Sequence, residues 1–583
     1  MDRRALLRGS ALGGAGLAAA ALLGCSGEDE PAATQAPSST TAAATGTAAA
    51  SQVKVFKDDA LQFAYTFPDK TTTVKPGGVY KQGTTIDIAS LDTTTSASAV
   101  TIQIPNIVYN RLLGYVHGTN PKYNPFKLEL EPELASSWEV SPDGLTYTFK
   151  LAPNVKFQQK APLNGRAFTS ADVKYAYERY KAGGVNTGYF LAVDHFETPD
   201  ANTFRAVLKR PSPDFLIPLG SFYTTIHPKE LVDDGSIAKT AVGTGPFILQ
   251  TAEAGKGSTF AKNPDYFKGA PYLDGMETRL IPDPASRLAA FRAGQIDRGD
   301  QIVTTKADVD ALLKTNPDTQ VNQGIVLGGG GMGLPTDVAP WTDDRVRHAL
   351  ALGIDGQRIA NIVYPGQAVK RLPVPWWSFV FDTEPTGAGG EFGKWWKYDP
   401  AQAKALLMAA GQENLEFTNQ YYVFSSVNTA LSNVLGDLYR DIGVKMKEET
   451  VEYGTFNSKW VARTSQVAST GAWYPVGFTA DVFFVDHLKT GAPGNRLRIS
   501  DPEIDKLSDQ QTVELNPTAR CALLHKIWDR DLELMYRLPT AVSAPSYETY
   551  GPAVRGLRFD GGNGPSSYFY SLGAQSDKVW LDK

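Results

Sequence analysis

The residues best suited to recognise a ligand are aromatic side chains that stand in adjacent pairs in the second half of the chain. Neighbouring residues on a strand point to opposite faces, so one ring can pack in the core while the other meets a ligand. Trp and Tyr combine a flat apolar ring with a polar edge, which suits both roles. The pairs are Trp376–Trp377, Trp395–Trp396, Tyr421–Tyr422 and Trp473–Tyr474. Core packing and ligand contact both stay open for each pair.

The chain shows no recognisable arrangement for catalysis or metal binding. Its six histidines form no close pair and no H-E-x-x-H sequence, and no G-x-S-x-G sequence presents a serine nucleophile. The glycine run at 328–333 satisfies G-x-G-x-x-G, but Leu334 and Pro335 follow it instead of the helix that a dinucleotide site requires. We therefore expect a protein that binds its ligand without transforming it, with no metal and no cofactor.

Length and charge narrow the class of protein further. A chain of 583 residues exceeds the size of one hydrophobic core, so two or more domains are expected. The 57 Lys and Arg against 62 Asp and Glu give a net charge of -5. A nucleic-acid partner would require a basic field, which this balance does not provide.

The first 24 residues have the features of an export signal. Arg3 and Arg4 precede an apolar stretch at 11–23 that is shorter than the ~20 residues a membrane span needs. The adjacent arginines resemble a twin-arginine signal, but they also occur in general secretion signals, so the export route stays open. Residues 22–25, Leu-Leu-Gly-Cys, resemble the lipobox of bacterial lipoproteins, which predicts lipidation of Cys25 and attachment to the outer face of a membrane. Residues 25–51 are rich in Ser, Thr, Ala and Pro and are expected to form a flexible linker.

Several segments downstream carry clear local signals for strands and helices. Alternating apolar residues at 138–140 and 145–149 flank a Ser-Pro-Asp-Gly turn, which predicts a hairpin. Thr169 and Asp172 fit a capping box for a helix that ends at 183–184. Asp399 and Pro400 start a second helix that Gly411 ends, and apolar spacing at 431–442 predicts a third, followed by a strand at 444–448. This mixture favours α/β lobes over a single barrel or bundle.

Together these segments resemble one known family. Residues 132–149, Pro-Glu-Leu-Ala-Ser-Ser-Trp through Asp-Gly-Leu-Thr-Tyr-Thr-Phe, resemble the signature of family 5 extracellular solute-binding proteins. That family supplies the peptide-, dipeptide- and nickel-binding components of ABC importers. The resemblance continues in the family's order over most of 76–583, at 168–177, 243–247, 263–267, 293–297, 345–355 and 398–411.

The resemblance implies a two-lobed periplasmic-binding-protein-like α/β fold of type II, with an extra subdomain in lobe one and a hinge between the lobes. Lobe one is expected at 75–282, lobe two at 283–540, and the chain is expected to return to lobe one over 541–583. The passages between lobes are expected at 280–284 and 538–544. Closure of such lobes around a ligand is a known switching motion.

The same resemblance implies where a ligand is held. Peptide-binding members carry a Gly-Trp-x-x-Asp stretch whose Asp holds the α-ammonium of the peptide; this chain keeps the Trp as Trp473 but has Val476 in place of the Asp. Asp481 is a candidate replacement, because a buried ammonium needs a partner. The full set of candidate ligand contacts is Trp473, Tyr474, Tyr453, Thr95, Ser96, Asp481, Trp376 and Trp377.

The function that follows is an extracytoplasmic lipoprotein, monomeric, that captures a small ligand and delivers it to the permease of an ABC transporter. A peptide is the leading ligand class. An oligosaccharide or another neutral polar solute is the alternative that the missing carboxylate favours. A sensor lipoprotein without a permease and a surface hydrolase are the two further alternatives.

Overall fold

The computed structural model describes residues 54–57, 62–65, 73–85, 87–88, 90–95, 99–116, 129–299, 302–326, 331–365, 380, 390, 392–422, 426–471, 479–538, 540, 544–557 and 576–583. The predicted export signal, the predicted lipid site Cys25 and the linker to residue 51 lie outside these ranges. Within them, no helix has both the length and the apolar composition needed to cross a bilayer.

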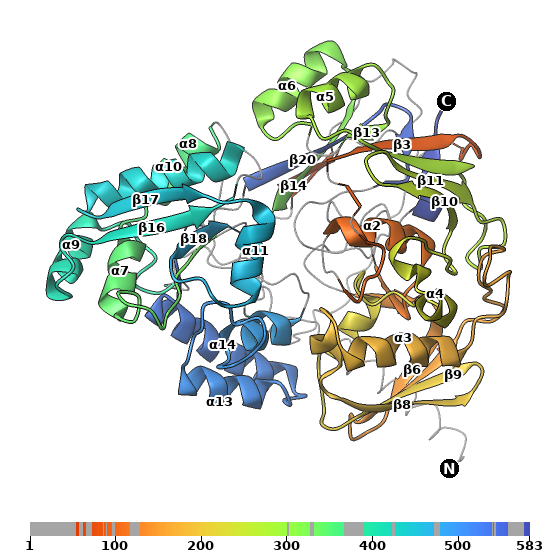
Figure 1. The fold of residues 1–583 in the computed structure, drawn as a ribbon, viewed down its shortest axis with the longest axis horizontal. Helices are drawn as coiled ribbons and strands as arrows, with labels where there is room; N and C mark the ends of the chain where they lie inside the picture. Colours follow the sequence, from red (N-terminus) through yellow and green to blue (C-terminus); the bar gives the residue numbers. More distant parts are fainter. Residues whose placement is uncertain are drawn as a thin grey trace, which may run out of the picture.

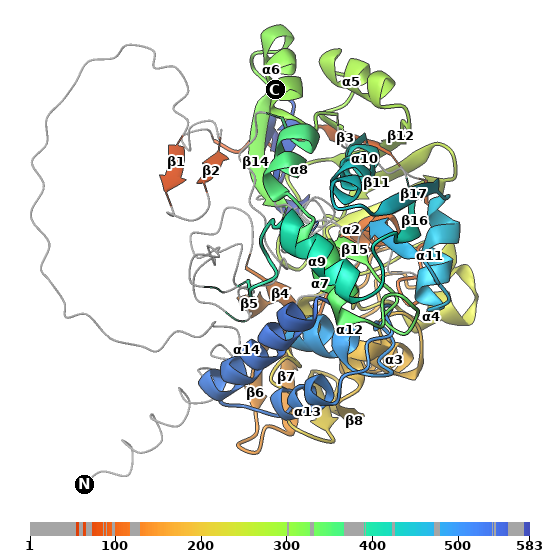
Figure 2. The same ribbon diagram turned by 90° about the vertical axis from the view of Figure 1, so that its left-hand side faces the viewer.

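The described residues form two bodies that lie side by side, which we call lobe one and lobe two (Figure 1). Lobe one contains a mixed sheet whose nine described strands are ordered β1-β2-β14-β20-β13-β3-β12-β11-β10. Its strands are β1 (Lys54–Lys57), β2 (Gln62–Tyr65), β14 (Gln320–Val326), β20 (Ala544–Tyr550), β13 (Arg298–Gly299), β3 (Val79–Thr84), β12 (Gly275–Leu280), β11 (Gly257–Lys262) and β10 (Phe247–Glu253). Figure 2 shows β1 and β2 at the edge of this sheet, beside β14.

A core of buried side chains lies against this sheet and joins distant parts of the chain. Helix α2 (Ala99–Val108) contributes Ile104, Ile107 and Val108 to it. The C-terminal residues Val579 and Leu581 pack in the same core. The last described residues of the chain therefore belong to lobe one. Helices α5 (Pro284–Arg292) and α6 (Lys306–Thr315) supply a smaller core next to it, with Tyr547 of β20.

A subdomain of lobe one is built on a four-stranded antiparallel sheet, ordered β6-β7-β9-β8 among the described strands. The predicted hairpin is confirmed: β6 (Ala135–Val140) pairs with β7 (Thr146–Leu151), and β9 (Thr203–Leu208) and β8 (Val193–Asp200) follow. Helix α3 (Ser170–Ala182) begins as predicted, because the Asp172 carboxylate accepts a 2.9 Å hydrogen bond from the backbone N–H of Thr169.

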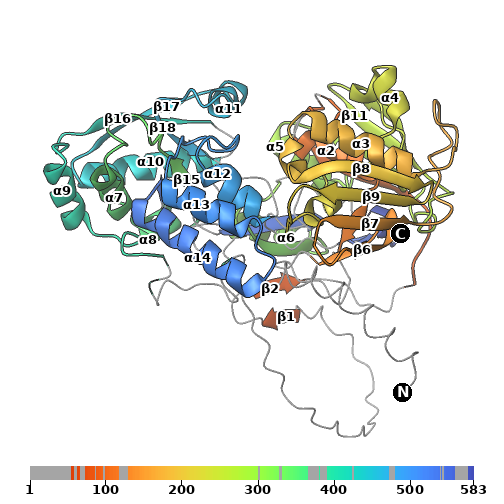
Figure 3. The same cartoon turned by 90° about the horizontal axis from the view of Figure 1, so that it is seen from below.

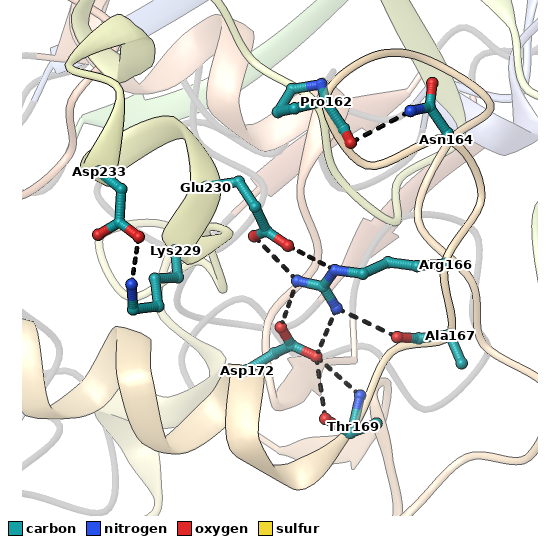
Figure 4. Close-up of polar contacts among 9 residues, drawn as sticks. All are labelled: Pro162, Asn164, Arg166, Ala167, Thr169, Asp172, Lys229, Glu230 and Asp233. Atoms are coloured by element: carbon teal, nitrogen blue, oxygen red, sulfur yellow. Dashed lines mark hydrogen bonds and ion pairs between the residues drawn. The ribbon is translucent and has the colours of Figure 1, made fainter.

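One arginine fastens the start of α3 to the neighbouring helix α4 (Lys229–Asp233), as Figure 4 shows. The guanidinium of Arg166 donates to Asp172 at 2.7 Å and to Glu230 at 2.7 Å. A planar guanidinium can bind two carboxylates at once through its separate N–H groups. Through Arg166, Asp172 at the start of α3 is therefore linked to Glu230 of α4.

Lobe two contains a second sheet, ordered β17-β16-β18-β15-β19 among the described strands. Its strands are β17 (Lys445–Thr450), β16 (Glu416–Tyr421), β18 (Ala468–Gly471), β15 (Gly331–Gly333) and β19 (Arg537–Leu538). Its helices are α7 (Asp344–Leu352), α8 (Gly356–Val363), α9 (Pro400–Ala409), α10 (Ser426–Asp441), α11 (Tyr453–Val461), α12 (Asp486–Leu488), α13 (Pro502–Gln511) and α14 (Pro517–Leu534).

The helices that the sequence predicts in lobe two are confirmed. Asp399 accepts a 2.9 Å hydrogen bond from the N–H of Gln402 at the start of α9, and Gly411 beyond its end has a φ of 66°. A left-handed conformation of this kind favours glycine after a helix. Helix α10 connects β16 to β17, and the two strands are parallel, as expected for a strand–helix–strand unit.

The chain passes between the two sheets at two places that lie next to each other. Strand β14 pairs antiparallel with β20 in lobe one, and β15 pairs antiparallel with β19 in lobe two. The chain runs from the end of β14 toward β15 and from β19 toward the start of β20. Figure 1 shows β14 and β20 above the centre, between the lobes. Paired strands thus flank both passages, while residues 327–330, 539 and 541–543 lie outside the described residues.

The expected boundary of lobe two at residue 283 differs from the observed pairing of strands. Strands β13 and β14 both follow residue 283, yet they pair with β3 and β20 in the sheet of lobe one. We therefore infer that lobe two extends from β15 to β19. The boundary depends on which sheet each strand joins, and a strand can join a sheet by pairing with a strand more than 200 residues away.

Candidate ligand-binding site

The two lobes share one buried apolar cluster, which we call the interlobe cluster. Lobe one contributes Ile102, Tyr115, Ile217, Phe222 and Tyr223. Lobe two contributes the larger part of the cluster. Its members include Met332 and Leu334 at and just after β15, and Phe483, Phe484 and Leu488 in the segment that ends with α12. Apolar surface that two lobes bury together stabilises their contact. This boundary is where a two-lobed binding protein would hold a ligand.

A buried ion pair crosses the same boundary. Arg520 of α14 donates to both oxygens of Asp214 in lobe one, at 2.6 and 2.7 Å, and the two side chains are only 6% and 7% exposed. Burial alone would lower the pKa of Arg520, but the charge and hydrogen bonds of Asp214 raise it above its usual value. The backbone N–H of Asp481 donates to Asp214 as well, at 3.1 Å. We call Asp214, Arg520 and Asp481 the interlobe ion cluster.

Asp481 lies at this contact, in a turn of π-helix, η5 (Asp481–Val485). Its Oδ1 accepts hydrogen bonds from Gln511 Nε2 at 2.6 Å and from Thr512 Oγ1 at 3.2 Å, and lies 3.5 Å from Arg520. Burial raises the pKa of Asp481, and the charge of Asp214 raises it further. One oxygen of this carboxylate is therefore engaged by donors of the chain itself.

On the lobe-one side, the loop at 92–95 is held in place by several hydrogen bonds. Asp92 accepts two from Arg179, at 2.6 and 2.9 Å. Burial opposes ionisation of Asp92, but these bonds and those from Thr94 lower its pKa to about 2. Thr95, a predicted contact, is exposed and donates from Oγ1 to the backbone oxygen of Asp92 at 3.1 Å.

One asparagine ties that loop to the interlobe cluster. Asn186 Nδ2 donates to the backbone oxygen of Thr93 at 3.0 Å and to that of Tyr223 at 2.8 Å. Since Tyr223 belongs to the interlobe cluster, the loop that carries Thr95 lies beside the contact between the lobes. Asp481 thus lies at the boundary, and the loop that carries Thr95 is linked to a lobe-one residue of the interlobe cluster.

Most of the other predicted contacts fall outside the described residues: Ser96, Trp376, Trp377, Trp473 and Tyr474. Tyr453 is described only as the first residue of α11, whose start is capped by Glu452 through a 2.9 Å hydrogen bond from the N–H of Thr455. The segment that carries Trp473 follows directly on β18 and precedes η5. The described residues on both sides of Trp473 therefore belong to lobe two, and η5 lies at the boundary.

Sequence reasoning missed the Asp214–Arg520 pair. The two residues are 306 positions apart, and neither occurs in a motif that points to a partner. No signal in the sequence could have joined them. Metal binding has no support in the described part of the chain, where no group of three or more His, Cys, Asp or Glu side chains is arranged to hold an ion.

Comparison with known proteins gives a consistent result. The family of bacterial extracellular solute-binding proteins, family 5, matches residues 129–495. Heme-binding protein A of Haemophilus influenzae is 28% identical over 451 residues, covering 71% of this chain and 78% of that protein. Di/tripeptide-binding protein 2 of Pseudomonas aeruginosa is 30% identical over 321 residues, covering 50% of this chain and 58% of that protein.

A solved structure shows the same fold. The ABC transporter-associated periplasmic binding protein DppA from Helicobacter pylori, in complex with the peptide STSA, superposes with a TM-score of 0.71. The sequences are 24% identical, and the match covers 87% of this chain and 99% of that one. The chain therefore belongs to the family 5 bacterial extracellular solute-binding proteins, a family whose members bind solutes and are not enzymes.

Proposed function

We propose that this protein binds a peptide between its lobes outside the cytoplasmic membrane and delivers it to the permease of an ABC transporter. The proposal rests on the contact between the two lobes. Two bodies with their own sheets are joined by two adjacent passages and meet across a shared apolar cluster and an ion cluster. Relatives named as peptide-binding and as ABC transporter-associated support the ligand class and the partner.

Calorimetric titration tests the ligand class directly. The full-length protein would be titrated with alanine peptides of two to six residues, with maltose oligosaccharides, and with haem, because one relative is named for haem. Saturable binding of peptides with one ligand per chain would support the proposal. Binding of a saccharide or of haem with no response to any peptide would contradict it.

We propose Trp473, Tyr474, Tyr453, Trp376, Trp377, Thr95 and Ser96 as the ligand contacts. Asp481 is a weaker candidate for an ammonium partner, because Gln511 and Thr512 already donate to its Oδ1.

Trp473→Ala is expected to weaken binding of the best peptide by about thirty-fold or more, because a tryptophan at the centre of an interface commonly contributes about 2 kcal/mol or more. Calorimetry of the variant against the same peptide measures the change. Trp395→Ala serves as the matched control, since the Trp395 ring stacks on His348 within lobe two at a centroid distance of 3.9 Å. Equal affinity in the two variants would remove Trp473 from the site.

We further propose that the protein is exported through the signal that contains Arg3 and Arg4 and is anchored by acyl chains on Cys25. Cys25→Ser is expected to shift the protein from the membrane fraction to the soluble extracytoplasmic fraction, because acyl chains provide the attachment. Fractionation and immunoblotting measure the distribution, and mass spectrometry of the wild-type N-terminal peptide detects the acyl chains. Retention of the variant on the membrane would contradict the anchor.

A permease that co-purifies with the protein would favour import over a sensor role.

A further inference from the structure

The interlobe ion cluster brings two carboxylates to one guanidinium. Asp214 of lobe one accepts a hydrogen bond from each terminal nitrogen of Arg520, at 2.6 and 2.7 Å. Asp481 of lobe two lies 3.5 Å from the same guanidinium, which is an ion pair but longer than an ordinary hydrogen bond. A single positive charge cannot neutralise two negative ones, so the cluster itself holds one negative charge in excess.

Gln511 of α13 keeps Arg520 and Asp481 next to each other within lobe two. Its Oε1 accepts a 3.1 Å hydrogen bond from Arg520 Nε, and its Nε2 donates to Asp481 Oδ1 at 2.6 Å. If the lobes separate, Asp214 moves away with lobe one, whereas Asp481 stays beside Arg520. The guanidinium therefore has Asp214 as its bidentate partner in the closed arrangement and Asp481 as its neighbour in the open one.

The closed contact disfavours the charged form of Asp481. Burial raises the pKa of Asp481 most, and the like charge of Asp214 raises it further, whereas Arg520 and the hydrogen bond from Gln511 lower it in part. Separation of the lobes would remove Asp214 and much of the burial but would leave Arg520 and Gln511 in place. The Asp481 side chain is 26% exposed, so water can exchange a proton with it in the closed structure.

The basic and phenolic groups around the cluster keep one charge state between about pH 5 and about pH 8. Arg210 of lobe one donates across the boundary to the backbone oxygen of Thr512 at 3.3 Å, and its charge offsets part of the rise in the pKa of Asp481. Arg210 and Arg520 stay positive, because a guanidinium loses its proton only in strong base. Burial and the charge of Asp214 raise the pKa of Tyr147 to about 12, so this phenol stays neutral.

We propose that Asp481 competes with Asp214 for Arg520 and makes closure of the lobes depend on pH, with a proton taken up at Asp481 as the lobes close. The charged carboxylate of Asp481 attracts Arg520 in the open arrangement and repels Asp214 in the closed one. A proton on Asp481 removes both effects and leaves the guanidinium to Asp214. Acid therefore favours the closed arrangement, whichever ligand the protein binds.

The pH range follows from linkage between closure and protonation. The pKa of Asp481 is higher in the closed arrangement than in the open one, so closure gains its full advantage below the open-state pKa. That advantage is lost as the pH rises through the closed-state pKa. Between these two values the ratio of closed to open protein changes about ten-fold per pH unit. Protonation of Asp214 would act in the opposite direction, because it would weaken the pair that joins the lobes.

Small-angle X-ray scattering of the ligand-free protein tests the proposal. The radius of gyration of the wild type should fall as the pH is lowered from about 8 to about 5, because proton uptake at Asp481 favours closure. Asp481→Asn removes the titrating group and keeps an oxygen that can accept from Gln511 and Thr512. Its radius should equal the smaller wild-type value already at about pH 8 and should not change with pH.

Asp486→Asn is the matched control. Asp486 follows η5 directly and burial raises its pKa too, but its Oδ1 accepts from the backbone N–H of Gly494 at 2.9 Å, within lobe two. This variant should keep the compaction of the wild type in acid.

A wild-type radius that stays constant or grows in acid would overturn the proposal, and this measurement needs no variant to fold. Compaction that persists in Asp481→Asn would overturn it as well, as would compaction that Asp486→Asn abolishes. All of these measurements are made without ligand, so a failure of the proposed peptide function would leave their outcome unaffected.

Discussion

Asp214→Ala is expected to open the two lobes and to weaken ligand binding. The substitution leaves the Arg520 guanidinium buried at the boundary without its bidentate partner. Breaking a buried pair by removing one member costs about 3–5 kcal/mol. Arg520 can regain water if the lobes separate, so the cost falls on the closed arrangement and shifts the equilibrium toward the open one by about a hundred-fold or more.

Small-angle X-ray scattering of the ligand-free protein measures this effect as an increase in the radius of gyration. The contact is well placed to act on closure, because α13 and α14 approach lobe one below the centre of Figure 1, whereas β14 and β20 lie above it. Figure 3 shows the same approach from below, with the subdomain strands β6 to β9 on the facing side. An unchanged radius together with unchanged thermal unfolding would contradict the prediction.

Two further variants separate the buried pair from general charge effects. Asp509→Ala removes a carboxylate that pairs with Lys489 on the surface and is 67% exposed, so its effect should stay below about 1 kcal/mol. The double variant Asp214→Leu with Arg520→Met removes both charges and should recover much of the closed state, because apolar residues can replace a buried pair at little cost.

Glu133→Ala is expected to lower the free energy of unfolding by about 3–5 kcal/mol, because it leaves the buried Arg111 charge unpaired. The Glu133 carboxylate accepts hydrogen bonds from Arg111 Nε at 2.9 Å and from Asn110 Nδ2 at 2.7 Å. The Arg111 and Glu133 side chains are 8% and 2% exposed. Urea denaturation followed by circular dichroism measures the loss. A change below about 1 kcal/mol would show that the pair contributes little.

The same carboxylate predicts how stability depends on pH. Burial opposes ionisation of Glu133, but the charges of Arg111 and Lys268 and the hydrogen bonds from Arg111 and Asn110 hold its pKa below the usual 4.5. A carboxyl with a lowered pKa stabilises the fold above its unfolded pKa, and this contribution is lost as the pH falls through the folded pKa. The difference in stability between the wild type and Glu133→Ala should therefore shrink in acid. Glu178→Ala, which removes an exposed partner of Lys174, should show neither the loss nor this pH dependence.

The signature segment illustrates what a sequence can and cannot explain. Pro132, Glu133 and Leu134 belong to the stretch that resembles family 5, yet nothing in their order shows why a charged residue stands between two apolar ones. The structure supplies the reason, since Glu133 neutralises Arg111 inside lobe one while Leu134 is fully buried beside it.

Local elements were predictable because their signals lie within a few residues of each other. The Ser-Pro-Asp-Gly turn between β6 and β7, the capping of α3 by Asp172 and the capping of α9 by Asp399 each depend on hydrogen bonds between near neighbours. The overall class of fold followed from the order of many such elements and from the family that they resemble.

The placement of residues at the boundary required the tertiary structure. Strand β14 pairs with β20, more than 200 positions away, and so joins the sheet of lobe one although it follows the expected boundary at residue 283. Arg520 meets Asp214 across 306 positions. The sequence alone determined the local elements and the family, because backbone hydrogen bonds and periodicity act over short distances. Only the folded chain decided which distant charges pair, because that outcome depends on how the sheets and lobes pack together.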